Sequence, residues 1–412
     1  MRFQVMSVDT SNQHLLPDTR YDVALVGSVI YSQTEQVFLD GLLRTFRPLS
    51  NHLLVFTGNY QNVNAGEIEL VNVVAHSTKA KGVKRILQLL KEQIKLSIVL
   101  VHKSHSYRFA VFHAGEYRNL IPFCLCKIMQ KKTIFHHFGG NKFRDAYLET
   151  SNRVLRHFIP YIHLDLQDAV YRHSDVVVLE AYRTISWGGL RKHQRRIAAP
   201  LHPEGLDDTR DARPQAKSKE LDCCFVGRLS PKRKLLKLIE SIPILVERHP
   251  DFHLTVVGRG PLLDSCEKQV KNMNLSKHVT FIPFIESLDS LYTESSFLIF
   301  PSSEEGIPHV IIEAMYYGLP VIASPVGAIP EVIVDGNTGF LLRSESPESM
   351  GESLLKAFDY TDLEAIKSNA HRLVMSRYGS SVTIAKYARI LEKLSRAERC
   401  NSSTDLFFDG RS

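Results

Sequence analysis

Residues Ser302 to Leu342, SSEEGIPHVIIEAMYYGLPVIASPVGAIPEVIVDGNTGFLL, decide the fold of this chain. The apolar segment Val310 to Tyr317 comes just after Pro308, a residue favoured in the first turn of a helix, and it stops at a glycine. Pro320 to Ser324 has the length and composition of a short buried strand. The stretch therefore predicts a loop, a helix, a strand and a second loop.

Two carboxylates, Glu305 and Glu313, lie eight residues apart in this stretch. The spacing places one at the mouth of the predicted helix and the other two turns along, so that both can face one ligand. Each carboxylate can accept two hydrogen bonds from hydroxyl groups, so the pair suits a polyhydroxylated ligand. The alternative is that both are solvated charges at a helix end.

The N-terminal half alternates strand-like apolar segments with helical patterns, which favours a doubly wound parallel sheet of the α/β class. A helix is predicted from Val37 to Phe46. The predicted strands are Tyr21–Val26, His52–Thr57, Glu69–Val74, Ser97–Val101, Phe109–Phe112, Lys132–His136 and Asp175–Leu179.

The same pattern restarts at Leu221, after residues 203–220, which are rich in proline, glycine and charge and have the composition of a linker. We therefore expect two Rossmann-like domains, 1–202 and 221–380, facing across a cleft, with ligands beyond the carboxyl ends of the strands. An amphipathic helix at 381–400 is expected to cross back toward the N-terminal domain, before a tail at 401–412. Further predicted elements are strands 221–227, 253–258, 279–283 and 297–301 and helices 235–247 and 262–273.

Charge is distributed unevenly along the 412 residues. The net charge is +11 for residues 1–200 and −4 for residues 201–412, which sum to +7. A basic half suits an anionic membrane or a pyrophosphate-linked acceptor, or is simply a solvated surface. Nucleic acid is not expected as a partner, because no basic motif interleaved with aromatic residues is present. The basic helix predicted at Lys81–Lys95 either lies on an anionic membrane or covers a sheet.

The six cysteines include no C-x-x-C pair, and several lie in apolar runs, which favours reduced thiols in a cytoplasmic protein. Residues 1–18 lack the apolar core of a signal peptide. No run approaches the roughly 18 apolar residues of a membrane span. We therefore expect a cytoplasmic location, with peripheral contact on the cytoplasmic face of the membrane as an option.

The opening stretch resembles the C-terminal nucleotide-sugar site of the retaining GT-B glycosyltransferases, the large E-x7-E family also called glycosyl transferases group 1 or family 4. Glu305 and Glu313 match the paired glutamates, GLPVIAS matches the following strand, and Gly327 to Glu331 with DGNTGFLL matches the last segment. The resemblance extends from about Leu221 to Phe358, roughly a third of the chain. It implies a GT-B fold.

A second segment resembles the family's Gly-Arg-Leu motif, in which the arginine meets the donor pyrophosphate. Here it is Gly227-Arg228-Leu229, directly after a predicted strand. The family usually has a lysine five residues later, whereas this chain has Arg233 between Lys232 and Lys234. A guanidinium can clamp a diphosphate through two hydrogen bonds, and which of the three basic residues does so stays open.

Other donor-binding residues follow from the same resemblance. Gly258 and Gly260 resemble a Gly-x-Gly-Pro loop that lets the backbone approach the nucleotide. Pro283 and Phe284 stand where the family's backbone contacts the nucleobase. The positive end of the helix predicted at Val310 to Tyr317 favours phosphate or sugar oxygens. The residues that open this helix are Gly306, Ile307 and Pro308.

The N-terminal half resembles the family less. In the segment IFHHFGGNK, His136 resembles the histidine that contacts the donor sugar, with His137 as the alternate and Lys142 as a further charge for the pyrophosphate. Leu179-Glu180 replaces a typical serine, and the hinge is reduced to residues 197–200. On the acceptor side, the residues proposed are Gly27 and Ser28, which replace the usual glycine-rich loop, and His113.

The resemblance implies a hexosyltransferase that moves a sugar, with retention, from a nucleoside-diphosphate donor to a glycan or lipid-linked acceptor in cell-surface polysaccharide synthesis. Arg228 would stabilise the leaving diphosphate, Glu305 would orient the sugar and Glu313 would hold the ribose. No Asp-x-Asp metal motif occurs, so neither a metal nor a cofactor besides the donor is expected. The alternatives are another GT-B enzyme, such as a nucleotide-sugar epimerase or a phosphorylase, and a catalytically silent GT-B binding module.

Overall fold

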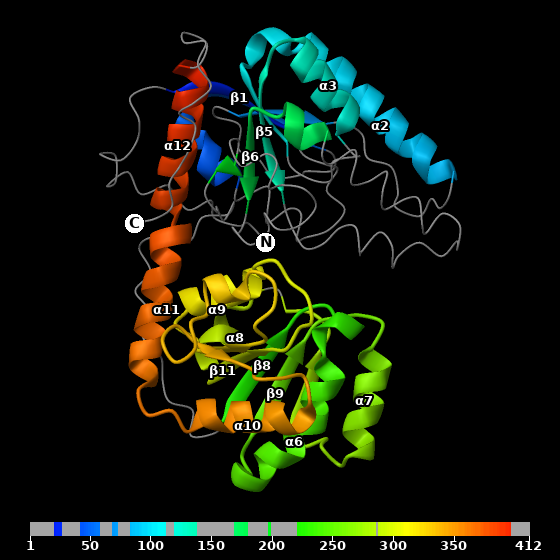
Figure 1. Ribbon diagram of the computed structural model, residues 1–412. Helices are drawn as coiled ribbons and strands as arrows, with labels where there is room; N and C mark the ends of the chain where they lie inside the picture. The colour runs from blue at the N-terminus through cyan, green and yellow to red at the C-terminus, as the bar shows by residue number, and fades with distance from the viewer. Residues whose placement is uncertain are drawn as a thin grey trace. The chain divides into compact units, whose positions relative to one another are not determined.

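The computed structural model divides the chain into two compact units, each of which is described by itself (Figure 1). One unit comprises Met1–Glu180, Ile185–Asp207 and Tyr378–Ser412, and the other comprises Ala181–Thr184 and Asp208–Arg377. The structure describes residues 20–26, 42–57, 68–72, 83–112, 119–137, 169–179, 197–198, 221–285 and 287–396.

The N-terminal unit is built on a sheet whose described strands all pair in parallel. The strand order is β3-β2-β1-β4-β5-β6-β7, so the chain changes direction across the sheet between β1 and β4. The strands are β1 Tyr21–Val26, β2 Ser50–Thr57, β3 Ile68–Asn72, β4 Phe109–Phe112, β5 Lys132–His137, β6 Val176–Leu179 and β7 Ile197–Ala198.

Helices cover both faces of this sheet. On one face, Leu96 and Leu100 of α2 (Val83–His102) and Phe123 of α3 (Leu120–Ile128) join the core with the strand side chains. On the other face, Tyr387, Ile390, Leu391 and Leu394 of α12 (Ser380–Arg396) join a second core. The C-terminal helix therefore contributes to the core of the N-terminal unit.

The predicted strand at Ser97–Val101 is wrong, because these residues form the last part of α2. The run LSIVLV is rich in β-branched residues, which favours a strand when the segment is considered alone. The helical spacing of Gln93, Leu96, Ser97 and Leu100, all buried, continues the pattern of the preceding turns instead. Tertiary packing on the sheet thus overrides the local preference.

The C-terminal unit is built on a second parallel sheet, with the order β10-β9-β8-β11-β12-β13. The prediction of two doubly wound parallel sheets is therefore confirmed. The strands of the C-terminal sheet are β8 Asp222–Val226, β9 His253–Val257, β10 Val279–Ile282, β11 Phe297–Phe300, β12 Val321–Ala323 and β13 Phe340–Leu341.

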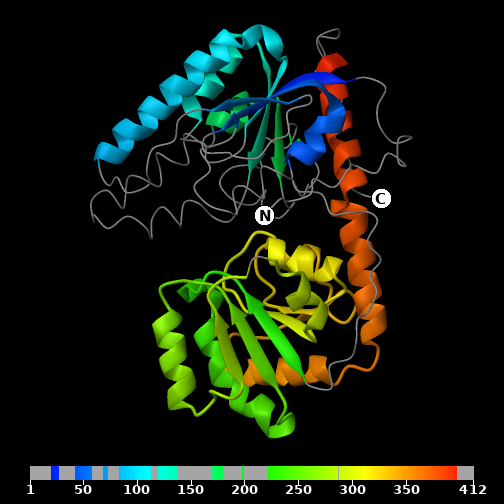
Figure 2. The same ribbon diagram turned by 180° about the vertical axis from the view of Figure 1, so that it is seen from behind.

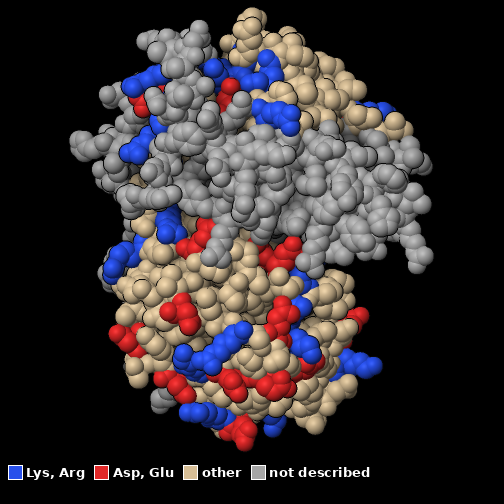
Figure 3. Space-filling model, in the orientation of Figure 1, with Lys and Arg blue, Asp and Glu red and all other residues tan. Residues whose placement is uncertain are grey.

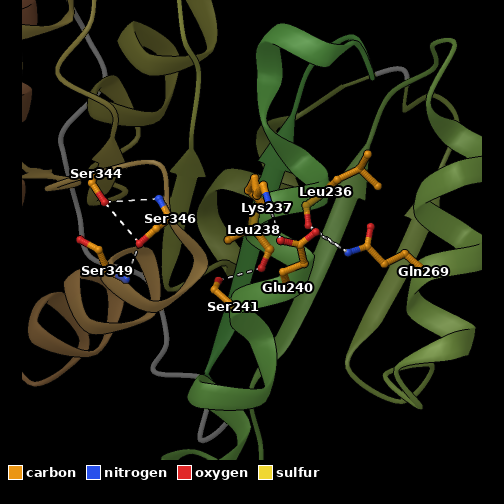
Figure 4. A network of polar contacts seen from close by, with 9 residues as sticks. All are labelled: Leu236, Lys237, Leu238, Glu240, Ser241, Gln269, Ser344, Ser346 and Ser349. Atoms are coloured by element: carbon orange, nitrogen blue, oxygen red, sulfur yellow. Dashed lines mark hydrogen bonds and ion pairs between the residues drawn. The ribbon is translucent and has the colours of Figure 1, made fainter.

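Helices α6, α7 and α10 share one core with this sheet, and α8 and α9 lie on the opposite face (Figures 1 and 2). Gln269 of α7 donates to the Leu236 carbonyl and to Glu240 of α6, and Ser346 caps the N-terminus of α10 (Figure 4). The helices are α6 Leu235–Arg248, α7 Leu263–Asn272, α8 Asp289–Glu294, α9 His309–Tyr316, α10 Pro347–Phe358 and α11 Leu363–Tyr378.

None of the helices in the described part of the chain is long and apolar enough to cross a membrane.

Candidate active site

The candidate site lies where the C-terminal sheet reverses its winding. From β8 the chain continues to β9 on one side, whereas β11, the other neighbour of β8, leads on to β12. Loops that follow two such strands leave the same edge of the sheet and separate, which opens the place where ligands bind in doubly wound folds. The loop after β8 begins at Gly227, and the loop after β11 contains Glu305.

Arg233 and Glu305 meet across this switch point. Arg233 ends a short 3-10 turn, Pro231–Arg233, and its Nη1 lies 2.7 Å from Oε1 of Glu305. The two side chains are only 17% and 9% exposed, respectively. The guanidinium also lies over the ring of Phe300, 4.7 Å from its centroid, which adds a cation–π contact. The basic residue that the loop brings to Glu305 is therefore Arg233.

Ser302 holds the same carboxylate oxygen. Its hydroxyl donates to Oε1 of Glu305 over 2.7 Å and is itself fully buried. The amide of Ser303 donates to the Lys232 carbonyl over 2.9 Å, which ties the β8 loop to the β11 loop. Sequence reasoning missed Ser302, although its place three residues before Glu305, at the end of an apolar strand, was a usable signal.

Burial shapes the ionisation of this pair. It raises the pKa of the Glu305 carboxyl above its usual value, and the nearby Arg233 charge opposes that rise. Burial also lowers the pKa of the Arg233 guanidinium, while Glu305 opposes the change. A guanidinium nonetheless stays protonated in proteins, so Arg233 remains a cation with little water around it. An anionic ligand that reaches Arg233 will compete with Glu305 for it.

Glycines let the loops approach one another. A Cβ added to Gly258 would lie 2.0 Å from the Gly227 carbonyl oxygen, and one on Gly260 would lie 2.2 Å from that of Leu229. Gly327 has φ +57°, and a Cβ there would lie 1.7 Å from the Glu305 carbonyl oxygen. Because a side chain at any of these positions would displace a backbone, the glycines fix the spacing of the loops.

Glu313 lies on α9 and accepts a hydrogen bond from another element. Tyr292 of α8 donates its hydroxyl to Oε2 of Glu313 over 2.9 Å and is only 2% exposed. Burial, reinforced by the Glu313 charge, raises the pKa of Tyr292 well above 10, so the hydroxyl keeps its proton at working pH. Tyr292 therefore positions Glu313. No local sequence signal pointed to it, because the contact spans 21 residues.

Replacing Tyr292 by phenylalanine is expected to raise KM for the donor about fivefold to tenfold with kcat nearly unchanged, because one hydrogen bond to a charged group is lost. Steady-state kinetics with varied donor concentration measure this. Tyr317→Phe is the matched control, since Tyr317 donates to Asp289 instead of Glu313. Equal effects of the two substitutions would contradict a specific role for Tyr292.

The other predicted donor residues occupy varied positions around these loops. Arg228 and Lys232 are exposed, whereas Lys234 pairs with Glu345 over 2.9 Å. Pro283 and Phe284 follow β10 and are exposed beyond its carboxyl end. The residues that precede α9, Gly306, Ile307 and Pro308, are all buried. Pro308 is the N-cap of α9, whereas the sequence predicted it in the first turn.

The structure buries His136, the residue for which the sequence predicts a contact with the donor sugar. The side chain is 2% exposed, and its Nε2 lies 2.6 Å from the hydroxyl of Tyr387 on α12. Burial lowers its pKa to about 3, so the ring is neutral at working pH. The neutral ring packs between β5 and α12 within the N-terminal unit. The contact of His136 with the donor sugar stays a prediction.

The remaining N-terminal candidates are not tested by the structure. His137 is the last residue of β5, paired with Leu179 of β6, and its side chain is outside the described part. Gly27, Ser28, His113 and Lys142 lie outside the described residues. By topology, β1 and β4 are the strands at the switch point of this sheet, and they end at the residues just before Gly27 and His113.

Among the described residues, no group of three or more His, Cys, Asp or Glu side chains is placed to hold a metal ion.

Known proteins match the chain in both sequence and structure. Residues 207–373 match the family model of glycosyl transferases group 1. A protein of Haemophilus influenzae described as an uncharacterized glycosyltransferase is 27% identical over 264 residues, which cover 63% of this chain and 69% of that protein. The chain spans about half the length of other curated relatives that it matches.

Solved structures share the whole fold. Sucrose-phosphate synthase from Thermosynechococcus elongatus has a TM-score of 0.70 at 18% identity, over 92% of this chain and 100% of that one. HepE from Anabaena in complex with UDP and glucose has a TM-score of 0.62 at 18% identity, over 91% and 100%. At this identity the likeness concerns the fold alone. The chain therefore has the GT-B fold, and residues 207–373 are similar to the glycosyl transferases group 1 family.

Proposed function

We propose that this protein is a hexosyltransferase that moves a sugar from a nucleoside-diphosphate donor to a glycan or lipid-linked acceptor. The observation that carries the proposal is the meeting of Arg233 and Glu305 at the switch point of the C-terminal sheet, 2.7 Å apart and largely buried. The site offers a cation for a diphosphate next to a carboxylate for sugar hydroxyls. The complex of the structural neighbour HepE with UDP and glucose supports a donor of this class.

Arg233 and Arg228 are assigned to the leaving group. The bond between the anomeric carbon and the phosphate oxygen breaks, and negative charge grows on the departing diphosphate. Fixed cations in a site that excludes water stabilise this charge more than water does. The N-terminal end of α9, beside Gly306, adds a positive dipole. We assign this stabilisation to side chains and the helix terminus, without a metal.

Glu305 and Glu313 are assigned to hydroxyl groups of the donor. Both described contacts of Glu305, from Arg233 and Ser302, are made to Oε1, so Oε2 is the oxygen that we assign to the sugar. Glu313, oriented by Tyr292, would hold the ribose. The acceptor hydroxyl bonds to the anomeric carbon with retention, and its proton passes to the leaving phosphate. This step needs no cofactor.

The acceptor class is proposed from the charge of the N-terminal half. Its net charge of +11 suits an acceptor that carries pyrophosphate or lies on an anionic membrane. We propose a role in cell-surface polysaccharide synthesis, at the cytoplasmic face of the membrane.

A donor screen tests the proposed function. Thermal shift and release of nucleoside diphosphate are measured with UDP-, GDP-, ADP- and dTDP-sugars, with and without EDTA. We expect one donor to stabilise the protein and to release its diphosphate slowly, without any effect of EDTA. The effect of that donor should be lost in Glu313→Ala.

The outcomes separate the alternatives. Loss of release in EDTA would contradict the assignment without metal. A changed sugar that stays on the nucleotide would indicate an epimerase, and release that requires phosphate would indicate a phosphorylase. A thermal shift without any release, even with added acceptor extracts, would indicate a silent binding module.

A further inference from the structure

Helix α2 carries a second apolar face beside the one that packs on the sheet. Five large apolar side chains along it are exposed, by 41% to 63%. At about 100° per residue they fall within about 80° of the helix circumference, and so form one continuous stripe. We call them the α2 stripe; they are Leu87, Leu90, Ile94, Ile98 and Val101.

The α2 stripe is not needed to hold the helix on the unit. The arc of α2 that faces the sheet is made by buried Gln93, Leu96, Ser97 and Leu100, and Leu96 and Leu100 lie in the core. Gln93 also accepts from the amide of Ile121, which docks α3 beside α2. A helix that only covers a sheet has polar residues outside its buried arc. An exposed apolar stripe next to that arc indicates a partner.

The charges beside the stripe identify the kind of partner. Lys91, Lys95 and His102 are exposed and lie about 20–60° beyond Ile98 around the helix, so they border the stripe on one edge. Residues 83–112 contain six Lys and Arg and a single acidic residue, Glu92. Figure 3 shows the outer surface over α2 as mostly tan with blue side chains among it.

We propose that α2 is a membrane-docking helix that lies flat on an anionic lipid surface. An apolar stripe with a lysine border matches the lipid interface, where apolar side chains enter the acyl boundary and lysines meet the headgroups. The stripe from Leu87 to Val101 extends about 21 Å along the helix, which is long enough to lie across several headgroups. A protein groove would need no row of lysines beside the stripe. The proposal is independent of the transfer reaction.

Sedimentation with vesicles tests this proposal on the full chain. The probes are vesicles of phosphatidylcholine with about one third phosphatidylglycerol, and vesicles of phosphatidylcholine alone. We expect strong binding to the first at low salt and weak binding to the second. Leu90→Gln with Ile98→Gln should lower the partition constant at least about tenfold, because glutamine keeps the helix but removes the apolar contact. Lys91→Ala with Lys95→Ala should lower it about 30-fold.

Two controls show whether a loss of vesicle binding is specific to the α2 stripe. Val334→Gln removes an apolar side chain that is 48% exposed on the C-terminal unit, and it should leave binding unchanged. Unfolding temperatures and donor binding of all variants should match those of the wild type, because the changed side chains are exposed. Equal binding of the double glutamine variant and the wild type overturns the proposal, as does equal binding to both kinds of vesicle. A dimer that the glutamine variant abolishes, without vesicle binding, would assign the stripe to a second copy and also overturn it.

Discussion

Arg233→Ala is expected to lower turnover of the donor about 10³-fold, the size of effect seen when one preorganised charge-stabilising group is removed. The substitution removes the cation proposed to hold the leaving diphosphate. It also leaves Glu305 buried without its partner, which should cost about 2–3 kcal/mol of stability, less than for a fully buried pair. Steady-state kinetics and thermal unfolding measure the two effects separately.

Two further variants separate charge from geometry. Arg233→Lys keeps the charge but loses the planar fork, so we expect turnover between those of the wild type and the alanine variant. Lys237→Ala breaks an exposed ion pair with Glu240 of the same 2.7 Å length and should have almost no effect. Turnover of Arg233→Ala within threefold of that of Lys237→Ala would contradict the role of Arg233.

Gly327→Ala is expected to abolish donor binding in the accessible concentration range. The added methyl group would lie 1.7 Å from the Glu305 carbonyl oxygen, so a backbone must shift, and a shift at Glu305 would displace its carboxylate from Arg233 and Ser302. The positive φ of +57° adds strain that any residue with a Cβ carries. Isothermal titration with the donor identified in the screen measures the loss.

Gly336→Ala is the matched control for this prediction. Gly336 has φ +70°, but a Cβ there would meet nothing within 4 Å. It therefore carries the same backbone strain, about 1 kcal/mol, without the clash. Similar donor affinities of the two variants would show that the close contact between Gly327 and Glu305 is not needed for donor binding.

The C-terminal sheet was largely predictable from the sequence. Each of its buried strands is bounded by glycine or proline, as at Gly227, Gly258 and Pro283, and these breaks were visible in the sequence. The glutamates were also visible, because Glu305 comes just after an apolar strand and Glu313 is at helical spacing from it. Helices α10 and α11 were not predicted, since no recognised motif precedes either of them directly.

The features that the sequence did not show depend on contacts between distant segments. His136 was placed at the end of a strand correctly, but its environment is set by Tyr387, 251 residues away. Similarly, Ser97–Val101 has strand-like composition, and only the packing of Leu96 and Leu100 on the sheet shows that it is helical. The sequence also did not show that the turn directs Arg233 toward Glu305 and Lys234 toward Glu345, and which basic residue meets the pyrophosphate stays a prediction.

The central claim is that the switch point of the C-terminal sheet binds a nucleoside diphosphate through Arg233. Calorimetric dissociation constants of the nucleoside diphosphate and the matching monophosphate, for the wild type and Arg233→Ala, test it most directly. We expect the wild type to prefer the diphosphate by at least about tenfold and the variant to lose most of that preference, since one charge-assisted hydrogen bond contributes about 1.5–3 kcal/mol. An unchanged preference in the variant would contradict the account.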